Sequence, residues 1–89
     1  MTDESKFELK YPIPFPLKVI GLDEPDFEEF CIGIVRRHVP ELLEENISSH
    51  MSTGSKYRSV NFDFIAESRE QVDALYAELT HHKRVLMIL

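Results

Sequence analysis

The stretch 52–60, STGSKYRSV, contains the residue types that hold phosphate groups: a glycine, a lysine and several hydroxyls. A phosphate-binding P-loop has the pattern G-x-x-x-x-G-K-[ST] between a buried strand and a helix, where backbone N–H groups surround the phosphates. Here only one glycine, Gly54, precedes Lys56, and strand-like sequence lies on both sides. Spacing and context therefore predict a hairpin turn and not a nucleotide site. Lys56 and Arg58 remain candidates for contact with an anion or an acidic partner.

Four histidines and one cysteine are the next candidates, as metal ligands or as a nucleophile. His81 and His82 are adjacent, so on a helix their side chains point about 100° apart, while His38 and His50 lie far away in the sequence. A structural zinc site needs four convergent ligands. Cys31 lies on an apolar helical stripe, which favours a buried thiol over a reactive thiolate. We therefore expect no metal, no cofactor and no catalytic residue.

A small enzyme with a pocket built at a subunit interface is the alternative. Its candidate residues surround the predicted turn and are His50, Lys56, Arg58 and Asp63. The acids of residues 23–29 are better explained by the start of a helix, whose positive end they complement.

The length and net charge of the chain limit the classes of protein to which it can belong. A chain of 89 residues forms one small domain with little room for an enclosed active site. Its net charge of −6 argues against binding to nucleic acids or anionic membranes, because both need a basic surface. No apolar run approaches the ~20 residues of a membrane helix, and the polar start MTDESK does not resemble a signal peptide. With a single cysteine, we expect a cytoplasmic protein.

Prolines shape the beginning of the chain. Three of them alternate in residues 7–16, FELKYPIPFP, and each fixes its own φ and favours extended geometry in the preceding residue. We expect an extended N-terminal arm over residues 1–14 and a domain over residues 15–89. The domain begins with a strand over 15–22. One face of that strand carries Phe15, Leu17 and Val19.

Two helices are predicted from their ends and their apolar spacing. The first begins at Asp23-Glu-Pro-Asp and is stopped by Pro40, because proline and acids suit a first turn and proline ends a helix. The second begins at the capping box Ser68-Arg-Glu-Gln71. The apolar stripe of the first contains Phe27, Phe30, Cys31, Ile34 and Val35. That of the second contains Val72, Leu75, Tyr76 and Leu79.

Three further strands complete the pattern, over residues 46–53, 57–66 and 84–89. The strand 46–53 is polar, as edge strands usually are. The core face of the strand 57–66 carries Val60, Phe62, Phe64 and Ala66. Because its aromatic residues share that core face, the open face is polar, unlike that of RNA-recognition modules of similar fold.

The order of the predicted elements is β-α-β-β-α-β. Two right-handed βαβ crossovers joined by a hairpin give a four-stranded antiparallel sheet of order 4-1-3-2 with both helices on one face. We therefore predict an α+β protein, the ferredoxin-like sandwich.

The chain resembles the YbeD-like family of small bacterial proteins from about residue 7 to residue 89. Four stretches carry the resemblance: YPIPFPLKVIG (11–21), VRRHVP (35–40), STGSKYRSV (52–60) and the tail 71–89. Such proteins have a ferredoxin-like fold similar to the small-molecule-sensing ACT domains and are described as lipoate-linked regulators. The family has no established catalytic motif.

The ACT-like geometry implies a place for a ligand. It would lie at the turn between the first strand and the first helix, close to the positive helix N-terminus. The residues placed there by this analogy are Gly21, Leu22, Asp23 and Asp26.

The last strand suggests a second surface. Val85, Met87 and Leu89 are expected on its core face, which leaves Leu86 and Ile88 outside. With Ile20 and Leu22 of the neighbouring first strand, they predict an apolar patch on the open face of the sheet. Such patches usually mark contacts. Either the N-terminal arm covers this one through Phe7, Leu9 or Tyr11, or it is the interface of a homodimer or a protein partner.

These observations favour a non-enzymatic regulatory or interaction module. A small-molecule effector or a protein partner would bind one conformation or oligomer better than another and shift the populations. Binding of nucleic acid is the least favoured function.

Overall fold

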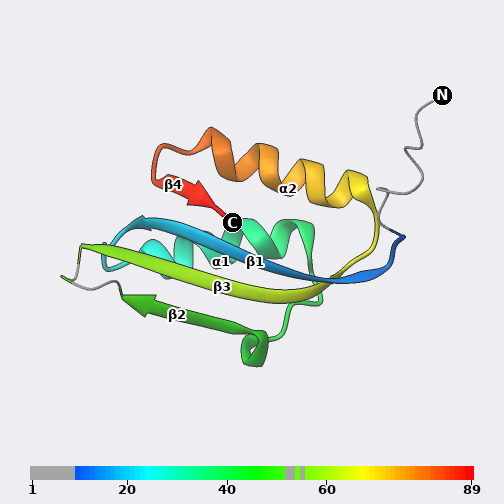
Figure 1. Ribbon diagram of the computed structural model, residues 1–89, viewed down its shortest axis with the longest axis horizontal. Coiled ribbons are helices and arrows are strands. Elements are labelled where there is room, and N and C mark those ends of the chain that lie inside the picture. Colours follow the sequence, from blue (N-terminus) through cyan, green and yellow to red (C-terminus); the bar gives the residue numbers. More distant parts are fainter. Residues whose placement is uncertain (1–9, 52–53, 55) are drawn as a thin grey trace.

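The computed structural model describes residues 10–51, 54 and 56–89. Its elements are β1 (Ile13–Leu22), α1 (Phe27–His38), the short 3-10 helix η2 (Glu44–Asn46), β2 (Ile47–Met51), β3 (Tyr57–Ala66), α2 (Arg69–His81) and β4 (Val85–Ile88). The four strands form one antiparallel sheet in the order β2-β3-β1-β4, which is the predicted order read from the other edge. The arrangement in Figure 1 confirms the ferredoxin-like α+β fold.

The centre of the sheet is the long antiparallel pair of β1 and β3, which runs from Ile13 opposite Ala66 to Leu22 opposite Tyr57. β1 begins two residues earlier than predicted, so Pro14 belongs to the sheet and not to the arm. β4 reaches β1 only from Lys18 onward. The prolines of β1 therefore lie where no second described strand needs their missing N–H groups. Residues 1–9 of the predicted arm lie outside the described part.

Both helices pack on the same face of the sheet, where their apolar stripes meet alternate residues of β1 and β3. The predicted core residues of β3 are all buried: Val60, Phe62, Phe64 and Ala66. The predicted cap of α2 is present, since Ser68 Oγ accepts a hydrogen bond from the Gln71 N–H at 3.1 Å. The Gln71 side chain also donates to the carbonyl of His38 at 2.7 Å. This side chain therefore ties the start of α2 to the end of α1.

β2 and β3 are antiparallel neighbours, with Met51 opposite Arg58. The connection between them contains Gly54, whose φ of +90° is accessible mainly to glycine. Because this segment joins two strands, it lacks the strand–loop–helix context that a P-loop requires. The other predicted turn residues, Ser52, Thr53 and Ser55, lie outside the described residues.

The prediction for the faces of β4 was right for Val85, which packs against the core, and for the exposed Leu86, but wrong for the three residues that follow. Ile20 pairs with Met87 but Gly21 pairs with Val85, so Leu86 is the extra residue of a β-bulge. One inserted residue moves the following side chains to the opposite faces of the sheet. Ile88, expected outside, lies opposite Val19 and packs against the core. Met87 and Leu89, expected inside, lie on the open face instead, opposite Ile20 and Lys18.

Candidate functional site

The turn between β1 and α1 is closely packed at its first residue. An ideal Cβ on Gly21 would lie 2.5 Å from the Phe27 ring and 2.5 Å from the carbonyl oxygen of Arg84. Real Cβ atoms do not approach other atoms so closely, so only glycine fits. Gly21 is buried and leaves no space for a ligand beside it. Its role is to let α1 pack against the strand.

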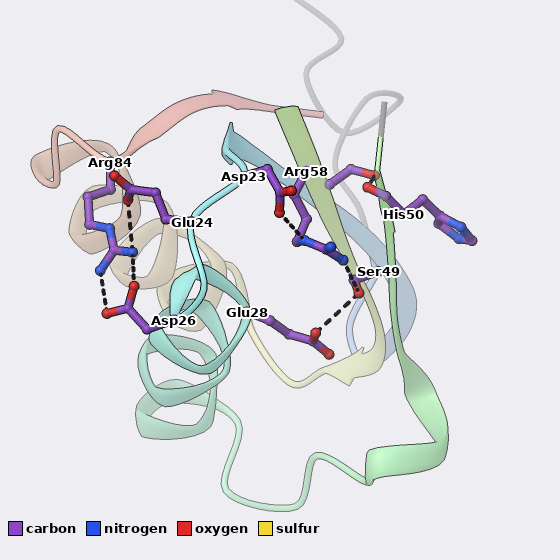
Figure 2. Close-up of polar contacts among 9 residues, drawn as sticks. Asp23, Glu24, Asp26, Glu28, Ser49, His50, Arg58 and Arg84 are labelled. Atoms are coloured by element: carbon purple, nitrogen blue, oxygen red, sulfur yellow. Dashed lines mark hydrogen bonds and ion pairs between the residues drawn. The ribbon is translucent and has the colours of Figure 1, made fainter. Parts of the chain in front are cut away.

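Asp23, the next polar residue of the turn, belongs to a chain of hydrogen bonds that joins the turn to β3, β2 and α1 (Figure 2). Arg58 of β3 donates from Nε to Asp23 Oδ1 at 2.7 Å and from an Nη to the Ser49 hydroxyl at 3.0 Å. Ser49 of β2 in turn donates to Glu28 of α1 at 3.2 Å. Arg58 and Asp23 are mostly buried, with side chains 22% and 20% exposed. The network closes one end of the core.

Asp26 faces a different arginine. Arg84, just before β4, binds both carboxylate oxygens of Asp26, at 2.6 and 3.2 Å, and also reaches Glu24 at 3.0 Å (Figure 2). Its guanidinium lies 4.6 Å from the centre of the Phe30 ring, a cation–π contact. The hydrogen bond from Arg84 lowers the pKa of Asp26, and the same bond raises the pKa of Arg84.

The four residues predicted as a ligand site therefore do not surround one space. Asp23 and Asp26 bind separate arginines, Gly21 is buried, and Leu22 is exposed on the open side of the sheet. The positive charges of Arg58 and Arg84 are already neutralised by carboxylates of the chain. An anionic ligand at this turn would have to displace one of these ion pairs.

The two arginines were not predicted as partners of this turn. The only sequence signal for these partners was that Arg58 lies within, and Arg84 directly before, a strand next to β1. The sequence also holds other arginines that could have paired with the same acids. Arg84 Nε is buried and has no partner among the described residues.

The candidate residues of the alternative enzyme do not converge. Arg58 is held by Asp23 and Ser49 on the core side of β3. Asp63 lies opposite Pro16, toward the other end of that strand, and the His50 side chain points away from the Arg58 network (Figure 2). The groove that Asp63 lines includes none of His50, Lys56 and Arg58. The four candidates therefore do not all line this groove.

The contacts of His38, His82 and Cys31 are those of structural residues. His38 Nε2 lies 2.7 Å from Glu78 of α2, and the rings of His82 and Phe30 meet edge to face at 5.0 Å. Cys31 is buried, and this burial raises the pKa of its thiol to about 12. Within the described ranges, no group of three or more His, Cys, Asp or Glu side chains could hold a metal ion.

The open face of the sheet carries an apolar group at its β1–β4 end. We call Ile20, Leu22, Met87 and Leu89 the outer cluster. Met87 lies directly opposite Ile20, and the other two follow at alternate positions on the same face. Leu22, Met87 and Leu89 are 45%, 52% and 63% exposed. Tyr11, one residue expected to cover such a patch, packs instead against the core, and Phe7 and Leu9 lie outside the described residues.

Comparison with known proteins identifies the family of this chain. Residues 6–89 match the family described as "Protein of unknown function (DUF493)". The chain belongs to this family. A UPF0250 protein of Hahella chejuensis is 40% identical, with both chains covered in full, and one of Chromobacterium violaceum is 34% identical over 89 residues, also with full coverage. A third, from Neisseria meningitidis, is 35% identical over 91% of this chain and 89% of its own. The resemblance to the YbeD-like family is confirmed.

Among solved structures, the chain is similar to the ACT domain of GTP pyrophosphokinase from Chlorobium tepidum. The TM-score is 0.67, with 86% of this chain and 83% of the other covered, at 10% sequence identity. At this identity the likeness shows a shared fold and nothing about the ligand. Among the described residues, neither helix is long and apolar enough to cross a membrane.

Proposed function

We propose that this protein is a non-enzymatic regulatory module of the cytoplasm that acts by binding, and that its working form is a dimer joined through the open sheet face. The outer cluster carries this proposal. Ile20, Leu22, Met87 and Leu89 form a contiguous apolar surface that neither helix covers. Exposed apolar surfaces of this kind usually mark contacts with another molecule.

A second copy of the chain fits this surface. In a two-fold dimer the same patch meets itself, so the patch must be self-complementary. The outer cluster is uncharged, so a second copy brings no like charges to its apolar centre. Polar side chains of β3 beside it, Ser59 and Asn61, supply the rim that surrounds the apolar centre of typical interfaces.

We propose that the dimer and an effector are linked through adjacent residues of the chain. Leu22 of the outer cluster directly precedes Asp23, which is held by Arg58. A charged small molecule that replaces this ion pair would move Leu22 and change the dimer surface. Effector binding and dimerisation would then be coupled, and each would alter the affinity of the other by the same factor.

Sedimentation of the purified protein over a range of concentrations tests the dimer. We expect the wild type to dimerise, and more strongly at higher salt, because screening weakens the repulsion between two chains of net charge −6. Met87→Lys should be monomeric. Ile65→Lys is the matched control, since Ile65 is equally exposed, at 52%, but lies at the other end of the sheet. A wild type that stays monomeric, or an equal effect of both variants, would refute the dimer.

Thermal unfolding against a panel tests the effector separately. The panel holds amino acids, nucleotides, octanoate, lipoate and divalent metals. A ligand of the folded state at a hundredfold excess over its dissociation constant adds about 2.7 kcal/mol of stability. A saturable shift that is lost in Arg58→Ala would support an effector at the β1–α1 turn. If no compound shifts the melting temperature, the dimer proposal stands, and the panel gives no support to a small-molecule effector.

A further inference from the structure

β3 is longer than its neighbour β2 at one end. β2 begins at Ile47, opposite Phe62, so the outer edge of β3 from Asp63 to Ala66 pairs with no described strand. The segment 39–46, which connects α1 to β2, passes beside this edge (Figure 1). A strand edge without a neighbour offers unpaired N–H and C=O groups at alternate residues.

A groove of about 630 Å³ lies between this edge, the segment 39–46 and the start of β1. Its apolar lining comprises Phe15, Val39, Leu42, Leu43, Phe64 and Ile65. Leu43 and Ile65 are more than half exposed. The groove therefore offers apolar contacts for side chains next to a strand edge, which is the combination that peptide-binding sheets use.

Three carboxylates complete the groove: Glu41, Asp63 and Glu67. All three side chains are exposed, and none forms an ion pair with a described residue. The lining of the groove includes no lysine, arginine or histidine. The partner that complements this surface is cationic as well as apolar.

We propose that this groove binds an extended segment of another protein in which lysine or arginine alternates with aliphatic residues. The segment adds a strand to β3 along Asp63–Ala66, places its aliphatic side chains against Leu43 and Phe64, and pairs its cations with Glu41 and Asp63. The groove lies at the opposite end of the β1–β3 pair from the outer cluster, so this site is independent of the proposed dimer.

Charge argues against the other occupants. A second copy of this chain brings a net charge of −6 to an acidic groove. Residues 1–9 of the chain itself hold three acids and one lysine. Fatty acids and nucleic acids are anionic and would meet three carboxylates with no cation in the groove.

Fluorescence anisotropy with two labelled peptides tests the proposal on the full chain. The probes are the hexapeptide KLKVKL and its acidic counterpart ELEVEL. We expect saturable binding of KLKVKL that weakens as salt rises from 50 to 300 mM, and no binding of ELEVEL. The double variant E41K/D63K should weaken KLKVKL binding at least tenfold. The control E70K reverses an exposed acid outside the groove and should leave the affinity unchanged.

Two further arms separate strand addition from simple attraction of charge. Alternate amides of KLKVKL are N-methylated in each of the two phases. Only the phase whose N–H groups face the β3 edge loses hydrogen bonds, so only that phase should lose binding. Amide NMR shifts caused by KLKVKL should concentrate in residues 39–43 and 63–67. Equal loss in E41K/D63K and E70K, shifts spread over the surface, or no binding of KLKVKL at millimolar concentration would overturn the proposal. Tighter binding of a peptide of residues 1–9 than of KLKVKL would also overturn it.

Discussion

Gly21 and Phe27 are in direct contact, and the ring occupies the space that any larger residue at position 21 would need. The contact fixes where α1 starts relative to β1. It also places the acids of the turn so that Asp23 reaches β3 and Asp26 reaches the residue before β4. The packing of one glycine therefore sets the geometry of both ion pairs.

Gly21→Ala should destabilise the protein strongly. The added methyl group would overlap both the Phe27 ring and the backbone of residue 84, and overpacking of this kind costs about 1–3 kcal/mol. Urea unfolding measures the change. Gly33→Ala is the matched control: its added Cβ, in the middle of α1, meets no atom within 4 Å apart from its chain neighbours and the backbone of its own helix. Stability should therefore rise by roughly 0.5–1 kcal/mol. Equal effects of the two substitutions would contradict the packing argument.

Arg58→Ala should lower the free energy of unfolding by about 1–3 kcal/mol, because Asp23 and Ser49 lose a charged hydrogen-bond partner in a mostly buried setting. Arg69→Ala provides the comparison. Its ion pair with Asp73 is exposed, with an arginine side chain 76% accessible, so the loss should be about 0.5 kcal/mol or less. A double-mutant cycle between Arg58 and Asp23 that shows no coupling would mean that the pair contributes nothing.

The pKa of Asp26 should lie below its ordinary value of 3.8, because Arg84 donates hydrogen bonds to its carboxylate. A depressed pKa contributes stability that is present above pH 3.8 and is lost as the pH falls through the folded-state pKa. Carboxyl NMR titration should show the pKa of Asp26 returning toward 3.8 in Arg84→Gln. That variant should also lose less stability than the wild type between pH 4 and pH 2. An unchanged Asp26 pKa would disprove the assignment.

Cys31 should resist thiol reagents in the folded protein. With a pKa of about 12 caused by burial, only about one thiol in ten thousand is ionised at pH 8, and the thiolate is the reactive form. Reaction with Ellman's reagent should therefore follow the rate or population of unfolding. In urea above the unfolding midpoint the thiol should react within the mixing time of a manual assay. Rapid reaction in buffer alone would show an accessible thiol.

The local pattern of residues was enough to predict most of the fold. The alternation of Val60, Phe62 and Phe64 identified β3 with the observed bounds, and Ser68 was correctly predicted as the cap of α2. These features depend on neighbours within a few positions, which propensity and periodicity describe directly. The strand order followed from the handedness of the crossovers, which is a general property of the chain.

The features that make up the candidate surfaces were decided only by tertiary structure. The bulge at Leu86 exchanged the faces of Met87 and Ile88, because one extra residue in a strand of period two reverses every later side chain. The choice of Arg58 and Arg84 as partners for Asp23 and Asp26 depended on which strand ends meet the turn. The acidic groove exists because β2 stops short of the end of β3, and the length of a strand pairing is set by both strands together and not by the sequence of either one.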